Sequence, residues 1–208
     1  MRNRDVLYVP ISKCDMVNQI THPSVYFQSA GRHNTSETLQ LALHYAQQLK
    51  IRHIVVASTT GSSALKFCRL AKNAFKIICV THQSGFAQPG KSELPVAVEK
   101  KLISRGVSVL RTTHLFGGVD RAIRHQFGGL GPPEIVANTY RTLGEGTKVA
   151  VEIAVMALDA GLVPYGKDII SIAGSSRGAD TALVIRPAHS HRFFATRIRQ
   201  IICKPWSF

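Results

Sequence analysis

A chain of 208 residues, of which 45% are hydrophobic, can bury a core of ordinary size, which excludes a disulfide-stabilised mini-protein and predicts one compact domain. Its 26 lysines and arginines against 12 aspartates and glutamates give a net charge of +14, which favours anionic partners, either phosphorylated metabolites or nucleic acid. No apolar run approaches membrane-spanning length and the four cysteines form no C-x-x-C pair, so we expect a cytoplasmic protein without a membrane segment.

The chain begins with a stretch that has no regular pattern, followed by a strand and a helix. Residues 1–23 are predicted to be an irregular N-terminal extension of a single domain that spans residues 24–208. An extended segment at Val25-Tyr26-Phe27 precedes Asn34 and Glu37, which have the spacing of a reciprocal capping box. Leucine and alanine then recur at helical spacing, which predicts a first β/α unit.

A second β/α unit follows, and its loop is rich in hydroxyl groups. Between an apolar strand pattern at residues 54–57 and a helical pattern at residues 64–70 lie Ser58, Thr59, Thr60, Gly61, Ser62 and Ser63. A helix N-terminus has unpaired amides and partial positive charge, so this loop can hold a phosphate or another anion. The alternative is that Ser62 or Ser63 merely caps the helix. The loop is neither a Walker A motif nor a Gly-x-Gly-x-x-Gly turn.

The remaining pattern continues the alternation and then changes to a hairpin. Strands are predicted at residues 75–80 and 107–110, with a helix at residues 95–105 between them. Helical segments follow after residue 119 and end at Gly161. Two further strands around a polar loop then predict a β-hairpin, at residues 169–173 and 181–185, and a last short strand is expected at residues 198–203. Three β/α alternations indicate a parallel sheet with helices on both faces.

Polar residues follow each predicted parallel strand. In open parallel sheets the ligand crevice lies outside the carboxyl ends of the strands, so these residues are expected to line one mouth. His82 and His114 each follow a strand and could donate to a phosphate or act as general acid and base. The alternative is a solvated sheet edge with structural histidines. No Cys or His spacing resembles a metal motif, so no metal site is predicted.

Two charged positions in the C-terminal half leave alternatives open. Glu152 stands in an apolar run, so it should have a partner or face the site, unless Lys148, Glu152 and Asp159 form a solvent-facing helical stripe. Arg177 and Asp180 lie in a glycine-flanked loop, where they would either clamp a ligand or form an internal ion pair that shapes the turn.

Several motifs together resemble a known family. Ser58-x-Thr60-Gly61-x-Ser63-Ala64 resembles the phosphate-gripping loop of the pyruvate kinase C-terminal domain. Residues from about 24 to 205 are similar to free-standing pyruvate kinase C-terminal-domain-like proteins. The motifs are Gly31-x-x-Asn34-Thr35-x-x-Thr38-Leu39, His82-x-x-Gly85-Phe86, His114, Glu152, Asp159-x-Gly161, Gly174-x-Ser176-Arg177-Gly178-Ala179-Asp180-Thr181-Ala182 and Arg186-Pro187-Ala188-His189.

The resemblance implies an α/β fold with three α/β/α layers, in which a mostly parallel mixed sheet has an antiparallel C-terminal strand. It also implies that hydroxyls at Ser58, Thr60 and Ser63 hold a phosphate. Ser62 stands where sugar-bisphosphate-binding pyruvate kinases commonly have Arg, so that ligand is not expected. The barrel domain that carries pyruvate kinase chemistry is not in this sequence, so we expect no transfer from phosphoenolpyruvate. Flavin mononucleotide (FMN) is a candidate ligand, although no flavin-specific motif is present.

The leading hypothesis is therefore binding of a phosphorylated small molecule. The predicted ligand-binding residues are Asn34, Ser58, Thr59, Thr60, Gly61, Ser62, Ser63, Arg177, Gly178 and Thr181. A second hypothesis makes the same pocket an enzyme site, with His82 or His114 as acid or base and Glu152 as its partner. A third is nucleic-acid binding driven by charge, which ranks lower because no nucleic-acid motif is present. The sequence is compatible with a homo-oligomer.

Overall fold

The computed structural model describes residues 20–72 and 74–208. Most of the predicted irregular extension, and Cys14 with it, therefore lies outside the described residues. In the described part of the chain, no helix is long and apolar enough to cross a membrane.

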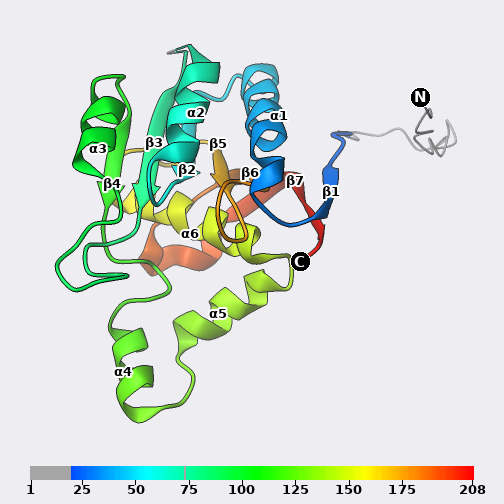
Figure 1. The fold of residues 1–208 in the computed structure, drawn as a ribbon. Helices are drawn as coiled ribbons and strands as arrows, with labels where there is room; N and C mark the ends of the chain where they lie inside the picture. Colours follow the sequence, from blue (N-terminus) through cyan, green and yellow to red (C-terminus); the bar gives the residue numbers. More distant parts are fainter. Residues whose placement is uncertain (1–19, 73) are drawn as a thin grey trace, which may run out of the picture.

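Seven strands form one mixed sheet in the order β1-β7-β6-β5-β2-β3-β4 (Figure 1). Their bounds are β1 (Val25–Ser29), β2 (His53–Ala57), β3 (Lys76–Thr81), β4 (Ser108–Arg111), β5 (Ile169–Ala173), β6 (Thr181–Arg186) and β7 (Arg197–Ser207). Only β6 runs against its neighbours: it is antiparallel to β5 and β7, whereas every other pair in the sheet is parallel. The carboxyl ends of six strands therefore share one edge.

Helices cover both faces of this sheet. The helices are α1 (Thr35–Gln48), α2 (Ser62–Ala71), α3 (Val96–Ile103), α4 (Val119–Phe127), α5 (Pro132–Arg141) and α6 (Glu145–Asp159), with short 3-10 helices η2 (Arg32–Asn34) and η3 (Ser190–Ala195). Helices α1, α2 and α3 lie over one face and α6 over the other (Figure 1). The predicted three-layer α/β/α architecture is thus confirmed.

Strand β2 explains why the central strands are apolar without interruption. Successive side chains of a strand point to opposite faces. Ile54 and Val56 accordingly pack into the core under α1, α2 and α3, while Val55 packs into the core under α6. A strand buried on both faces needs hydrophobic residues at every position, which is why no polar alternation marks it in the sequence.

In the C-terminal part, the hairpin is as predicted, but the last strand is longer than predicted. The predicted hairpin is present, with Ile169 opposite Ile185 and Ala173 opposite Thr181. The last strand is much longer than residues 198–203, because β7 pairs with β6 on one side and, in parallel, with β1 on the other. Cys68, Cys79 and Cys203 are buried and free. Burial raises the pKa of the Cys79 thiol to about 12.

Candidate functional site

A pocket of about 710 Å³ opens at the carboxyl ends of β2, β3 and β5. The loop after β2 contributes Ser58, Thr59, Thr60, Ser62 and Ser63, and the loop after β5 contributes residues 174–178. His82 follows β3, and Glu93 precedes α3. The parallel arrangement of these strands brings together loops that lie more than 100 residues apart in the sequence, as expected for an open α/β sheet.

The loop after β2 is built around the Ser58 hydroxyl. Its Oγ accepts hydrogen bonds from the amides of Ser63 (3.1 Å) and Ala64 (3.4 Å), so it satisfies two donors at the start of α2. The alternative that Ser62 or Ser63 caps this helix is therefore wrong, because Ser58 does so. The hydroxyls of the other four loop residues in the pocket remain at the positively polarised end of α2.

Gly61 shapes this loop from outside the pocket. Its φ is +80°, and a Cβ at this position would lie 2.5 Å from Cγ1 of Val98 and 2.9 Å from Cδ1 of Leu94. The glycine thus lets the loop turn in a left-handed conformation while its backbone packs directly against the α3 region. Gly61 was predicted to bind the ligand, but it does not line the pocket and instead supports the conformation of the loop.

His82 is held between two side chains of the pocket. Its Nδ1 lies 2.7 Å from Oε2 of Glu93, and its Nε2 lies 3.4 Å from Oγ1 of Thr59. Since an ionised carboxylate can only accept a hydrogen bond, Nδ1 carries the proton, and the neutral ring presents Nε2 as an acceptor. A hydroxyl followed by an imidazole and a carboxylate is an arrangement that can accept a proton from a bound group.

Three cationic side chains surround the hydroxyl-rich loop. Arg32, Lys66 and Arg177 line the pocket, and none of them forms an ion pair with another described residue. The two carboxylates of the lining are both partnered, Glu93 by His82 and Glu145 by Arg141. The pocket therefore combines a helix N-terminus with unpaired positive charge, which suits an anion.

Asp180 holds the loop after β5 against the start of α1. It is buried, and its carboxylate accepts hydrogen bonds from the amides of Gly31 (3.0 Å) and Ser175 (3.2 Å). Gly178 packs so closely here that a Cβ would lie 2.3 Å from Oγ1 of Thr35. Of the two alternatives for this loop, the internal Arg177–Asp180 ion pair is not formed, because Asp180 binds backbone amides while Arg177 lines the pocket.

The structure separates the predicted residues into two groups. Ser58, Thr59, Thr60, Ser62, Ser63, His82, Arg177 and Gly178 line the pocket, whereas Asn34, Gly61, His114, Glu152 and Thr181 are not in its lining. Asn34 donates to the Ser29 carbonyl and Thr181 donates to Asp180, so both have structural partners. Arg32, Thr35, Lys66 and Glu93 line the pocket but were not predicted.

Glu152 belongs to a buried ion pair behind the site. Its Oε2 lies 2.6 Å from Nζ of Lys148, and its Oε1 accepts the Phe116 amide at 3.0 Å. Both charged side chains are buried, so the alternative of a solvent-facing stripe is wrong for them. Glu152 is not the hydrogen-bond partner of His82, whose carboxylate partner is Glu93.

His114 lies beside His82, with the ring centroids 5.2 Å apart, and also contacts Phe86. Burial lowers the pKa of His114 below its ordinary value of 6.5, against the opposing effect of Glu152; His82, Lys148 and Arg121 lower it further. The lowered pKa favours the neutral imidazole at pH 7, which suits its packing against His82 and Phe86. Within residues 20–72 and 74–208, no group of three or more His, Cys, Asp or Glu side chains could hold a metal ion.

Comparisons with known proteins give a match over most of the chain. The family described as pyruvate kinase, alpha/beta domain, matches residues 36–185. Among solved structures, a pyruvate kinase from Cryptosporidium parvum is 16% identical with a TM-score of 0.36, covering 67% of this chain and 20% of that one. A C. parvum pyruvate kinase in complex with ADP is 17% identical with a TM-score of 0.37, covering 81% and 23%. The chain thus spans less than a quarter of either protein.

Proposed function

Because the chain belongs to the pyruvate kinase alpha/beta domain family, we propose that it binds a phosphorylated small molecule in the pocket at the carboxyl ends of β2, β3 and β5. The observation that carries this proposal is the hydroxyl-rich loop from Thr59 to Ser63 at the N-terminus of α2, facing a pocket with three cations that have no acidic partner among the described residues. The phosphate lies at this loop, and the rest of the ligand extends towards His82 and Arg177.

The size of the pocket suits a mononucleotide. Its volume of about 710 Å³ falls in the range of small-molecule sites, roughly 300–1,000 Å³. FMN is the first candidate because it joins a phosphate tail to a flat ring, and the pocket residue His82 has a second ring beside it, Phe86, with centroids 4.2 Å apart. ADP is the second probe, since a pyruvate kinase has been solved in complex with it.

The first test is mass spectrometry of the small molecules released when freshly purified protein is denatured. A stoichiometric phosphorylated compound supports the proposal and identifies the ligand. The second is titration with FMN and with riboflavin, which differ only in the phosphate. Fluorescence should report FMN binding at least about tenfold tighter, because a phosphate held by charge-assisted hydrogen bonds contributes about 1.5–3 kcal/mol.

The variant Thr60→Ala/Ser63→Ala should remove most of the difference between the phosphorylated and unphosphorylated ligand. The matched control is Thr139→Ala/Thr142→Ala, which deletes two exposed hydroxyls from the α5 region outside the pocket. Unchanged binding of the released compound, FMN and ADP by the pocket variant would reject the proposal.

A second candidate function is acid–base catalysis in the same pocket, favoured by the hydrogen bond between His82 and Glu93. In this hypothesis His82 takes a proton from a bound substrate at Nε2, while Glu93 orients the ring and stabilises its charged form. His82→Ala should then lower turnover about 10²–10⁴-fold with a small effect on ligand affinity. Turnover that survives this change would reject the catalytic role of His82 and retain only the ligand-binding proposal.

A further inference from the structure

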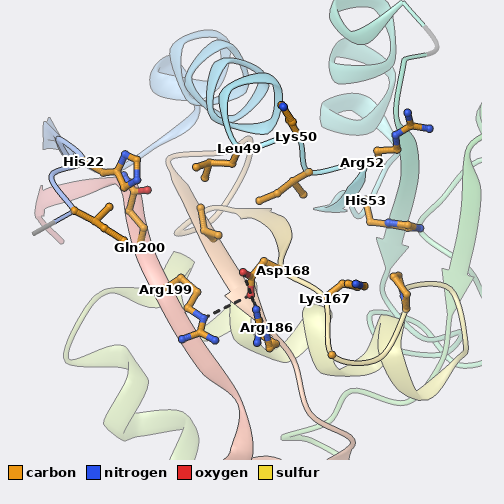
Figure 2. A pocket seen from close by; sticks show the side chains of 15 residues that line it. His22, Leu49, Lys50, Arg52, His53, Lys167, Asp168, Arg186, Arg199 and Gln200 are labelled. Carbon is orange, nitrogen blue, oxygen red and sulfur yellow. Dashed lines mark hydrogen bonds and ion pairs between the residues drawn. The ribbon is translucent and has the colours of Figure 1, made fainter. Parts of the chain in front are cut away.

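A second pocket, of about 920 Å³, lies at the opposite edge of the sheet. Figure 2 shows its walls, which come from the turn between α1 and β2, the turn between α6 and β5, the end of β6 and the start of β7. It shares no lining residue with the pocket described above. A ligand held here would therefore be independent of the hydroxyl-rich loop.

The lining of this second pocket is strongly basic. Lys50, Arg52, Lys167, Arg186 and Arg199 line it, and the only carboxylate among the described lining residues is Asp168. Lys50 and Arg52 stand on one side, while Lys167 stands across from them (Figure 2). None of these three forms an ion pair with a described residue.

Asp168 organises the two arginines without neutralising them. It accepts two hydrogen bonds from Arg186, at 2.8 and 3.1 Å, and Nε of Arg199 lies 3.6 Å from its Oδ1. One carboxylate between two guanidinium groups fixes their positions and leaves a net positive charge. Remaining N–H groups of both arginines stay available to an anion.

The backbone at Lys50 is unusual for a lysine. Its φ is 54°, and the turn is closed by hydrogen bonds from Lys50 N to Gln47 O and from Ile51 N to Ala46 O. Glycine commonly takes this position after a helix, because its φ is free. Lys72 has the same conformation after α2, with φ 45°, but it does not line the pocket. The two lysines share any favourable interaction with a helix C-terminus, so Lys72 is a matched control.

We propose that this second pocket binds a small polyanion that carries at least two phosphate groups. Cations on opposite walls can engage separate charged groups, and the volume is that of a small-molecule site. No Phe, Tyr or Trp is among the described lining residues, so only the smaller rings of His22 and His53 are present as surfaces on which the bases of a single-stranded nucleic acid could stack.

The test is calorimetric titration of the full chain with tripolyphosphate and with orthophosphate. Tripolyphosphate should bind at least about tenfold more tightly, and Lys50→Gly should weaken it about tenfold, since each charge-assisted contact contributes on this scale. Lys72→Gly should leave the affinity unchanged. Both changes relieve a positive φ, so both variants are expected to fold. Arg52→Gln provides a second variant at the pocket with no change in backbone conformation.

Thr60→Ala/Ser63→Ala distinguishes the two sites. Tripolyphosphate binding that persists in this variant and weakens about tenfold in Lys50→Gly supports the second pocket, whether or not FMN binding changes. No tripolyphosphate binding, or an equal loss in Lys50→Gly and Lys72→Gly, overturns the proposal. A single-stranded oligonucleotide that binds more tightly than tripolyphosphate and depends on Lys50 would instead identify a nucleic-acid site, which also overturns it.

Discussion

Nδ1 of His82 and Oε2 of Glu93 lie 2.7 Å apart, and the two residues come from opposite ends of the loop between β3 and α3. This contact determines which ring nitrogen carries the proton in the neutral imidazole. It also directs Nε2 towards Thr59 and the pocket. The tautomer of His82 is therefore a measurable consequence of the contact.

Glu93→Ala is expected to convert His82 from the Nδ1–H tautomer to a mixture of both tautomers, because the acceptor that favours Nδ1–H is removed. ¹⁵N chemical shifts of the ring measured above pH 8 report the ratio. Glu99→Ala is the control, since Glu99 pairs with Arg111 instead. A predominant Nε2–H tautomer in the unmodified protein would contradict the assignment.

Gly61→Ala should destabilise the fold by about 2–5 kcal/mol for two reasons. The alanine would have a strained left-handed φ, and its Cβ would collide with α3 and with the loop before α3. The control is Gly106→Ala, where φ is +74° but a Cβ would meet no atom within 4 Å. That change should cost about 1 kcal/mol. Chemical denaturation of the two variants measures the difference, and equal destabilisation would show that the Val98 contact is relieved without cost.

Lys148→Met is expected to cost about 3–5 kcal/mol of unfolding free energy, because it leaves the buried Glu152 carboxylate without its cation. Lys148→Met/Glu152→Gln should cost less than the sum of the two single changes, since the glutamine carries no charge. Urea unfolding of the three variants completes the double-mutant cycle. Additive costs would mean that the two charges do not stabilise each other.

The fold could be predicted from the sequence because its signals are local. Ile54, Val55 and Val56 form an apolar run too short for a helix, and the hydroxyl-rich residues that follow mark the strand end. Since parallel strands end at one edge, the meeting of that loop with His82 and Arg177 also followed from the pattern.

The partners within the site could not be predicted in the same way. Glu93 reaches His82 across an irregular loop of Gly, Pro and Ser that has no period from which to infer its path. Lys66 and Arg32 are exposed charges like many others in a chain with 26 cations. The burial of Lys148 and Glu152 could not be predicted from their spacing either, because Glu145, Lys148, Glu152 and Asp159 share one face of α6, the pattern of a helix with a solvent-facing stripe.

Stability should fall between pH 7 and pH 5 because of His114. Burial lowers its pKa in the folded protein below 6.5, so below pH 6.5 the unfolded chain binds a proton that the folded chain does not. The stability that the fold gains from keeping His114 neutral is complete above pH 6.5, and it is lost as the pH falls towards the pKa of His114 in the folded protein. His53 adds to the effect, because burial and Lys76 lower its pKa as well.

His114 can contribute a slope of up to about 1.4 kcal/mol per pH unit in this range, and the more exposed His53 contributes less because solvent screens its interactions. Urea unfolding at pH 5, 6 and 7 measures the slope, which His114→Gln should reduce and His44→Gln, at an exposed position of α1, should leave in place. The carboxyl of Asp159 does not contribute to the pH dependence of stability between pH 5 and pH 7. Burial raises its pKa, but hydrogen bonds from Ser190 and His189 outweigh this and hold the pKa below 3.8, so its contribution is lost only in stronger acid. A slope unchanged by His114→Gln would mean that this imidazole is protonated in the folded protein as readily as in the unfolded chain.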